Sequence, residues 1–293
     1  MSTEKLRLPS YGGQALIEGV LMRGSHYVAA AMRTPEGEIV VKTEKLSGIY
    51  NGKIVKIPLL RGLISLWDGL GLGLRLLTAS ANVQTGEDEK IEGPALFFTM
   101  LFSFAIAMVL FFLLPAASGR FIQNQLHWSQ FAGNLLEGII RLILVILYIW
   151  GIGKMSDIAR VFGYHGAEHK TINTFEAGLD LTIANVKNSS REHPRCGTAF
   201  ILDVVIFSVI IFSLLGSLSF GWLLLSRILL LPFIVMVAYE YLRWTANHLD
   251  SKIVRFIAFP GLKLQKLTTR EPSDEMIEVA IKSFNTMITL ENS

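Results

Sequence analysis

Four long apolar segments constrain this chain more than any other feature of its sequence. They cover residues 95–115, 135–151, 199–215 and 222–244. About 20 apolar helical residues cross the hydrocarbon core of a bilayer, which is roughly 30 Å thick. With 51% hydrophobic residues, 17% charged residues and a mean hydropathy of +0.46, the composition lies outside the range of ordinary soluble domains. The sequence therefore predicts a mainly α membrane protein with about four transmembrane helices.

The basic residues are distributed unevenly around these segments. They are frequent before the first segment, between the second and third, and after the fourth, whereas residues 116–134 contain only Arg120. Since cytoplasmic loops carry the excess of Lys and Arg, this predicts a multi-pass protein of the cell membrane with both termini cytoplasmic. We expect membrane lipid and a membrane-associated substrate as partners, and no nucleic acid, because the basic bias serves insertion and contact with anionic lipid.

The first 56 residues predict a cytoplasmic region that contains a β-hairpin. Residues 27–32 and 38–43 have the character of short strands, and the Thr-Pro-Glu-Gly sequence at residues 34–37 suits a tight turn between them. The glycine-rich stretch 11–19 precedes the hairpin. Two interpretations remain open for it: a loop packed under the membrane helices, or a loop that covers a functional site and contributes Gln14 or Glu18 to it.

Residues 57–94 predict an interfacial amphipathic helix followed by an acidic linker. Within the apolar stretch 57–81, Arg61, Asp68 and Arg75 recur every seven residues and form one polar stripe on a helix. Such a helix is expected to lie in the cytoplasmic interface of the membrane. A fifth span is disfavoured, because it would place the basic N-terminal region on the wrong side.

The remaining sequence divides into two further regions. Residues 95–244 form the four-helix transmembrane region, interrupted by a cytoplasmic loop over residues 152–198 that carries a cluster of histidines and the single cysteine. Residues 245–293 form a cytoplasmic C-terminal segment, with an amphipathic helix expected over residues 274–288.

The cytoplasmic loop contains the motif His-x-x-Glu-His. On a helix over about residues 164–177, His165 and His169 lie some 40° apart on one face, and Glu176 falls between them. Glu168 lies on the other side of His165. The arrangement matches the inverted zinc-peptidase motif, in which two histidines bind the metal and the glutamate is the base. It predicts a divalent transition metal, with zinc favoured over iron or manganese.

A second cluster, His193 and Cys196, lies at the far end of the same loop. The His-Pro dipeptide favours a turn that folds both side chains back toward the helix. Cys196 precedes Thr198, the expected N-cap of the third span, and a thiol beside a helix N-terminus and an arginine favours the thiolate. A thiolate suits either metal ligation or nucleophilic attack, and a buried structural cysteine is the third interpretation.

Charged residues in and near the fourth span provide further candidates. Glu240 lies near its cytoplasmic end, and His248 lies just beyond it, so both side chains emerge on the same side of the membrane as the cluster. Arg141 and Glu137 stand four residues apart in the second span, where internal pairing accounts for their presence.

Several motifs resemble those of the YqhQ-like family of bacterial membrane proteins. They are YGGQALIEGVLMRG at residues 11–24, YHGAEHKT at 164–171, HPRCGT at 193–198, PGL at 260–262 and LTTREP at 267–272. The resemblance covers almost the whole chain. It implies a multi-pass membrane protein and a predicted metal-dependent enzyme with no established substrate, and it supplies no demonstrated catalytic residues.

These observations predict a metal-dependent hydrolase at the cytoplasmic membrane face. His165 and His169 are the expected ligands, His193 or Cys196 completes the set, and Glu168 is the expected base. Two alternatives remain open. One is a non-enzymatic membrane scaffold or assembly factor with a structural metal. The other is a metal-free thiol hydrolase with Cys196 as the nucleophile.

Overall fold

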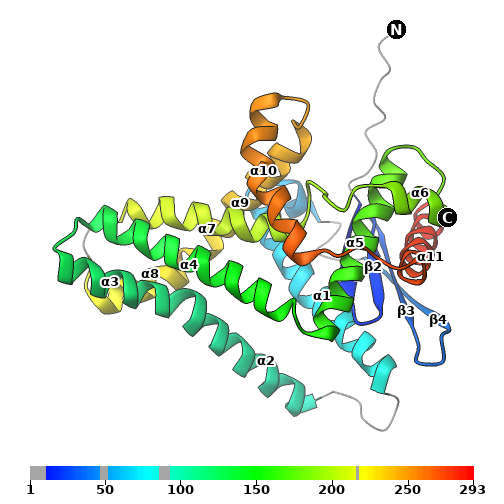
Figure 1. The fold of residues 1–293 in the computed structure, drawn as a ribbon, viewed down its shortest axis with the longest axis horizontal. Coiled ribbons are helices and arrows are strands. Elements are labelled where there is room, and N and C mark those ends of the chain that lie inside the picture. The colour runs from blue at the N-terminus through cyan, green and yellow to red at the C-terminus, as the bar shows by residue number, and fades with distance from the viewer. Residues whose placement is uncertain (1–10, 47–51, 86–92, 216–217) are drawn as a thin grey trace.

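The computed structural model describes residues 11–46, 52–85, 93–215 and 218–293. An elongated helical bundle lies at one end of the molecule, and a small β-sheet with its covering helices lies at the other (Figure 1). The strands are β1 (Gly12–Leu16), β2 (Gly19–Arg23), β3 (Tyr27–Arg33) and β4 (Ile39–Lys45). The helical elements are η2 (Lys53–Lys56), α1 (Leu60–Thr85), α2 (Gly93–Met108), η3 (Val109–Leu113), α3 (Leu114–Leu126), α4 (Gln130–Ile152), α5 (Ser156–Glu176), α6 (Ile183–Asn188), α7 (Gly197–Ser213), α8 (Phe220–Leu229), α9 (Leu231–Asn247), α10 (Lys252–Thr268) and α11 (Asp274–Glu291).

The four strands form an antiparallel sheet in the order β1-β2-β3-β4. The predicted hairpin is confirmed as β3 and β4, joined by a turn in which Gly37 has a φ of +92°. The loop predicted over residues 11–19 is wrong, because most of that stretch forms β1 and pairs with β2. Glu18 occupies the tight turn between them with a φ of +51°. The glycines thus serve close pairing in a sheet.

The sheet is covered by helices on both faces. One face carries side chains such as Val20 and Met22 and packs against α5 and α11. The alternate residues, such as Leu21, face the other way and pack against Leu72 and Leu76 of α1. This period-2 alternation between two apolar cores accounts for the hydrophobic character of β2 on both faces.

The polar stripe predicted on α1 faces the protein. Each of its three residues pairs with a different element. Asp68 pairs with Arg23 of β2, Arg61 with Glu240 of α9, and Arg75 with Glu44 of β4. The opposite side of α1 leaves Trp67 and Leu70 more than half exposed. A helix over this stretch is therefore confirmed. Some of its apolar side chains, such as Leu72 and Leu76, pack on the sheet, and others, such as Trp67 and Leu70, are exposed.

Two helices are long and apolar enough to cross a membrane by length and composition. They are the continuous helix Gly93–Leu126, which comprises α2, η3 and α3, and α4. Helices α8 and α9 meet at a bend of 44° and count as a third if the pair forms one span. The third predicted segment, residues 199–215, corresponds to α7, which has only 17 residues and lies between α4 and α9. The count is thus two or three candidates in the described part of the chain, against the four predicted.

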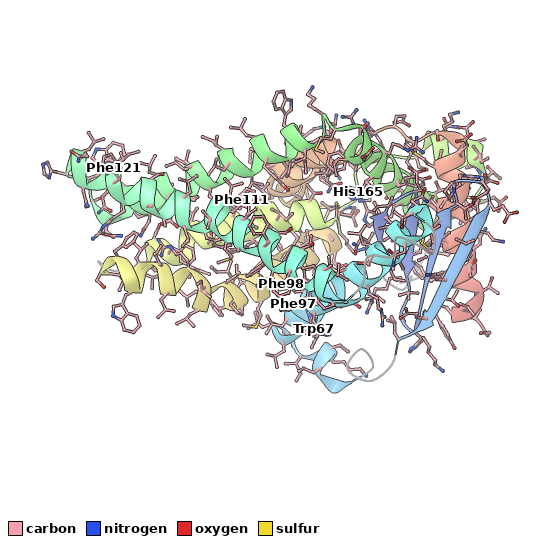
Figure 2. All side chains as sticks on the ribbon, turned by 90° about the horizontal axis from the view of Figure 1, so that it is seen from below. Trp67, Phe97, Phe98, Phe111, Phe121 and His165 are labelled. Atoms are coloured by element: carbon pink, nitrogen blue, oxygen red, sulfur yellow. The ribbon has the colours of Figure 1, made fainter. Side chains whose placement is uncertain are left out.

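Large apolar side chains cover the outside of the bundle. None of the residues of α2 is buried, and Phe97, Phe98 and Phe102 are all more than 60% exposed. Figure 2 labels several of these aromatic side chains, with Phe121 at the end of the bundle farthest from His165. A surface of this kind is unfavourable in water and favourable against lipid.

A charged network is buried at the centre of the bundle. The carboxylate of Glu137 accepts from Arg141, at 2.6 Å, and from Arg227 of α8, at 2.5 Å. Arg141 also donates to the Ser208 hydroxyl of α7 and to the Phe111 carbonyl, which lies in the π-turn η3. The predicted i,i+4 pair is confirmed, and a second arginine from another helix joins it.

The C-terminal segment contains two helices. The predicted amphipathic helix is confirmed as α11, whose side chains Ile277, Phe284 and Met287 are buried against the sheet and α5. No helix was predicted over residues 252–268, where the structure has α10. The helix continues through Pro260, and Gly261 allows close approach to Ala199 of α7.

Candidate functional site

Helix α5 positions the histidine motif between the sheet and the C-terminal segment. It ends where predicted, with Ala177 as the C-cap and Gly178 at a φ of +71°. A side chain at Gly166 would collide with the carbonyl oxygen of Arg270, so this glycine allows the segment after α10 to lie directly on the helix. His165 therefore faces the C-terminal end of α10, and His169 faces the segment before α7; these two segments form one wall of the site.

Three side chains converge at this wall. Potential ligand atoms of His165, His169 and Cys196 all lie within 4.8 Å of one another. The Cys196 Sγ is 3.4 Å from the His165 Nε2, and the two imidazole rings are 4.4 Å apart between centroids. Ligand atoms around tetrahedral zinc are separated by about 3.3–3.8 Å, given bond lengths of about 2.0–2.3 Å. The cluster is thus close to the size that one metal ion requires.

Backbone carbonyl groups orient both imidazoles. The Nδ1 of His165 lies 2.9 Å from the Thr268 carbonyl oxygen, and the Nδ1 of His169 lies 2.5 Å from the Arg191 carbonyl oxygen. Because a carbonyl only accepts, each Nδ1 carries the hydrogen and each Nε2 keeps its lone pair. Hydrogen bonding of this kind to the outer nitrogen is typical of metal-ligating histidines. The donor chemistry of the cluster therefore fits a transition metal.

Cys196 is itself the N-cap of α7. Its Sγ accepts from the backbone N–H of Thr198 at 3.4 Å, so the prediction that Thr198 is the N-cap is wrong. The hydroxyl of Thr198 instead contacts that of Thr268 at 2.8 Å. Cys196 is 4% exposed, and its sulfur faces His165 from the positive end of a helix.

Glu168 lies beside the cluster and is buried against β1. A Cβ at Gly13 would approach its Cγ to 2.8 Å, so the strand backbone passes directly over this carboxyl group. One of its oxygens, Oε2, is buried with no hydrogen-bond partner in the described residues. Burial raises the pKa of Glu168 to about 7, and the nearby His165 opposes this shift. The group therefore exchanges a proton near neutral pH.

His193 belongs to a neighbouring polar group. Its Nε2 lies 3.7 Å from the Glu176 carboxylate, which also pairs with Arg195. Burial lowers the pKa of His193, although its hydrogen bond to Glu176 acts in the opposite direction. The backbone of His193 makes two hydrogen bonds with the Gln265 side chain of α10, at 2.9 and 2.8 Å. Since its ring centroid is 5.6 Å from that of His169, His193 borders the cluster from outside.

The other candidates from the N-terminal region lie elsewhere. Gln14 projects onto the opposite face of the sheet, where its side chain meets Gly73 of α1. The Glu18 carboxylate binds Arg160, at 2.5 and 2.6 Å, and the Tyr164 hydroxyl, at 3.1 Å. It thereby anchors the first half of α5 to the β1–β2 turn.

The candidates at the end of the fourth apolar segment also lie outside the cluster. Glu240 accepts from Arg61 and from the Leu59 backbone at 3.0 Å, which fastens the start of α1 to α9. His248 packs its ring on Trp244 and contacts the Trp244 carbonyl oxygen at 2.8 Å. Both residues therefore have local partners.

Sequence reasoning missed the contribution of α10 and of the segment that precedes α7. The backbone carbonyl groups of Thr268 and Arg191 orient the two imidazoles, and the Gln265 side chain accepts from the backbone N–H of His193. Any residue type can make contacts through its backbone, so such contacts leave no pattern in the sequence. The LTTREP motif at residues 267–272, which contains Thr268, was the sequence feature that could have pointed to the end of α10 as part of the site.

Comparison with known proteins places the chain among uncharacterised relatives. Residues 57–290 match the family described as "Protein of unknown function (DUF1385)". The chain is also similar to the Uncharacterized protein YqhQ of Bacillus subtilis (strain 168), with 35% identity over 302 residues, 97% of this chain and 93% of the relative. No solved structure matches.

Proposed function

Because this chain belongs to the DUF1385 family of proteins of unknown function, we propose its function from the geometry of its own site: a metal-dependent hydrolase at the cytoplasmic face of the cell membrane. The observation that carries the proposal is the convergence of three metal-ligating side chains beside a buried carboxyl group with an unpartnered oxygen. Perturbed titratable groups next to such a cluster are typical of active sites.

His165, His169 and Cys196 would hold the metal, for which we propose zinc. Three protein ligands leave a fourth position open, as in catalytic zinc sites, whereas structural sites are closed by four. Zinc bound there supplies Lewis acidity and lowers the pKa of water to about 7. His193 remains outside this ligand set, and with Glu176 and Arg195 it holds the loop in place.

Glu168 is the proposed general base. Its free Oε2 can accept a proton, and the Gly13 backbone restricts the movement of its side chain. The second candidate function is a metal-free thiol hydrolase, favoured by the 3.4 Å contact between Cys196 and His165. The 4% exposure of Cys196 argues against it, because an attacking sulfur must reach the substrate.

Metal content tests the proposal. We expect purified protein to contain about one equivalent of zinc per chain and His169→Ala to lose most of it, because an Nε2 ligand is removed. His248→Ala is the matched control, since that ring packs on Trp244 of its own helix and lies outside the cluster, and it should retain the metal. Elemental analysis measures both. Less than a tenth of an equivalent in wild-type protein, with no thermal stabilisation by added zinc, would contradict the metal site.

The proposal also requires four crossings, with the sheet and the site on the cytoplasmic side. It is supported by the apolar surface of the bundle and by the basic residues near one end of it. We expect an impermeant thiol reagent to label Gln125→Cys in intact cells. Ser251→Cys should react only after the membrane is opened. Both exposed positions are tested in a Cys196→Ser background. The reverse labelling pattern would place the site outside the cytoplasm.

A further inference from the structure

A basic hollow lies where α4 ends. It has a volume of about 500 Å³ and is bordered by the end of α4, the chain around Arg191 and the C-terminal turn of α10. Its charged lining consists of Lys154, Arg191, Lys266, Arg270 and Glu271. Four cations therefore face one carboxylate.

The positive charge of the basic hollow exceeds what its surroundings neutralise. Glu271 is engaged by the buried Lys170, at 2.6 Å, and by Arg191, at 3.2 Å. Lys266 lies 3.7 Å from Glu192, at the outer limit of an ion pair. For Lys154, the described part of the chain provides no carboxylate partner. Arg270 donates to the Gly153 carbonyl, which carries no charge, and the described residues provide no carboxylate for it either. An anion entering the hollow would thus meet two cations, Lys154 and Arg270, without a carboxylate partner, beside two that have one.

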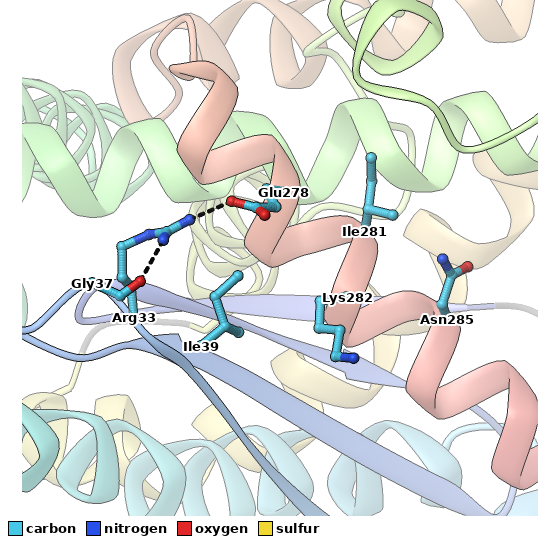
Figure 3. A pocket seen from close by; sticks show the side chains of 7 residues that line it. All are labelled: Arg33, Gly37, Ile39, Glu278, Ile281, Lys282 and Asn285. Atoms are coloured by element: carbon cyan, nitrogen blue, oxygen red, sulfur yellow. Dashed lines mark hydrogen bonds and ion pairs between the residues drawn. The ribbon is translucent and has the colours of Figure 1, made fainter.

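A second hollow of similar size differs in how its arginine is paired. The hollow between β3 and α11 measures about 510 Å³ and contains Arg33, Glu278 and Lys282. Arg33 donates to the Glu278 carboxylate, at 2.7 Å, and to the Gly37 carbonyl, at 2.8 Å (Figure 3). Its arginine is thereby satisfied within the protein.

The basic hollow opens beside an apolar helix end. Trp150 lines it from the last turn of α4, a span candidate, and is 55% exposed. The ammonium group of Lys154 lies 5.1 Å from the centre of the Trp150 ring. Tryptophan and lysine at the end of an apolar helix are typical of the level of lipid headgroups. The position suits a ligand that is itself part of the membrane.

The same two chain segments build the hollow and the His/Cys cluster. Arg191 lines the hollow with its side chain, and its carbonyl oxygen orients His169. Thr269 lines the hollow, while the carbonyl oxygen of its neighbour Thr268 orients His165. An occupant of the hollow therefore lies just across this wall from the cluster.

We propose that the basic hollow binds the phosphate-bearing headgroup of a membrane amphiphile. Arginine and lysine recognise phosphate through charge-assisted hydrogen bonds, and Trp150 faces the adjoining glycerol and chains. This binding site is separate from the His/Cys cluster and does not depend on the proposed hydrolase function.

Binding of a short-chain phosphatidate tests the proposal. Full-length protein in non-ionic detergent is titrated with dihexanoyl phosphatidic acid, and separately with inorganic phosphate, by calorimetry. We expect the double variant Lys154→Ala/Lys266→Ala to bind the phosphatidate about tenfold or more weakly than wild type. The control Lys42→Ala/Lys282→Ala removes the same charge from exposed positions on β4 and α11 and should bind as wild type does. Equal weakening of both variants, or of neither, would overturn the site.

Two further arms separate the possible outcomes. Inorganic phosphate binding as tightly as the phosphatidate would overturn the amphiphile and indicate a site for free anions. The single variant Lys154→Ala, matched with Lys42→Ala, repeats the comparison if the double variant unfolds.

His169→Ala should keep phosphatidate binding while it loses zinc. If wild-type protein purifies without zinc and still binds the phosphatidate, the metal-dependent hydrolase is contradicted and the headgroup site stands.

Discussion

Glu168→Gln is expected to abolish the biological activity of the protein while leaving its metal content unchanged. The amide has nearly the shape of the carboxyl group but cannot accept a proton near neutral pH. General-base catalysis typically contributes about 10²–10⁴-fold, which is the loss expected here. The measurement is complementation of a deletion strain with a scorable phenotype, alongside protein abundance and zinc content.

The control is Glu278→Gln, an exposed glutamate on α11, which should complement fully. His169→Ala completes the comparison, because it removes a ligand and not the base. If Glu168→Gln complements like wild type while His169→Ala fails, the metal has a structural role. The chain would then be a scaffold or assembly factor rather than a hydrolase.

Glu137→Ala is expected to cause the largest loss of stability of any single change in the bundle. It leaves the guanidinium groups of Arg141 and Arg227 buried without their shared carboxylate. Removing one partner of a buried ion pair costs about 3–5 kcal/mol, a large fraction of the stability of a typical domain. Thermal unfolding in detergent, followed by circular dichroism, measures the loss.

A compensated variant distinguishes charge from packing. The triple variant Glu137→Met/Arg141→Met/Arg227→Met removes all three charges at similar volume, and buried ion networks replaced in this way are often neutral or stabilised. We expect it to recover most of the stability that Glu137→Ala loses. A wild-type unfolding temperature for Glu137→Ala itself would mean that the two arginines are solvated in some other way.

The sequence predicted elements whose signals are local. Gly178 marked the end of α5, residues 34–37 marked the β3–β4 turn, and the apolar stripe of α11 marked a helix that packs on one side. The predictions failed where contacts between segments distant in the sequence determine the structure. Helix α10, which packs mainly on α7, was not predicted, and glycines that suggested a loop belong to the pairing of β1 with β2.

The same distinction applies to the candidate site. His165 and His169 belong to one helix, so their proximity followed from the helical period. Cys196 joins them from the start of α7, after a connection that contains α6. Glu240 and His248 were proposed as site residues only because they were expected on the same side of the membrane as the cluster. That expectation determines neither how far each residue lies from the cluster nor which way its side chain points. Each has a partner of its own on α1 or α9. A shared side of the membrane is a much weaker constraint than a shared helix face.

The pairing of β3 with α11 has a consequence for biosynthesis. The Glu291 carboxylate accepts from the backbone N–H groups of His26 and Tyr27, at 2.6 and 2.7 Å, from a position 265 residues after His26. At about 5–20 residues per second, a ribosome takes more than ten seconds to cover that distance. Throughout that time the sheet lacks the complete α11 that covers one of its faces, and the histidines of α5, once made, lack α10 until residues 252–268 have followed. The apolar helices of the bundle emerge in the interval, so the His/Cys cluster and its surroundings are completed only after the bundle has been synthesised.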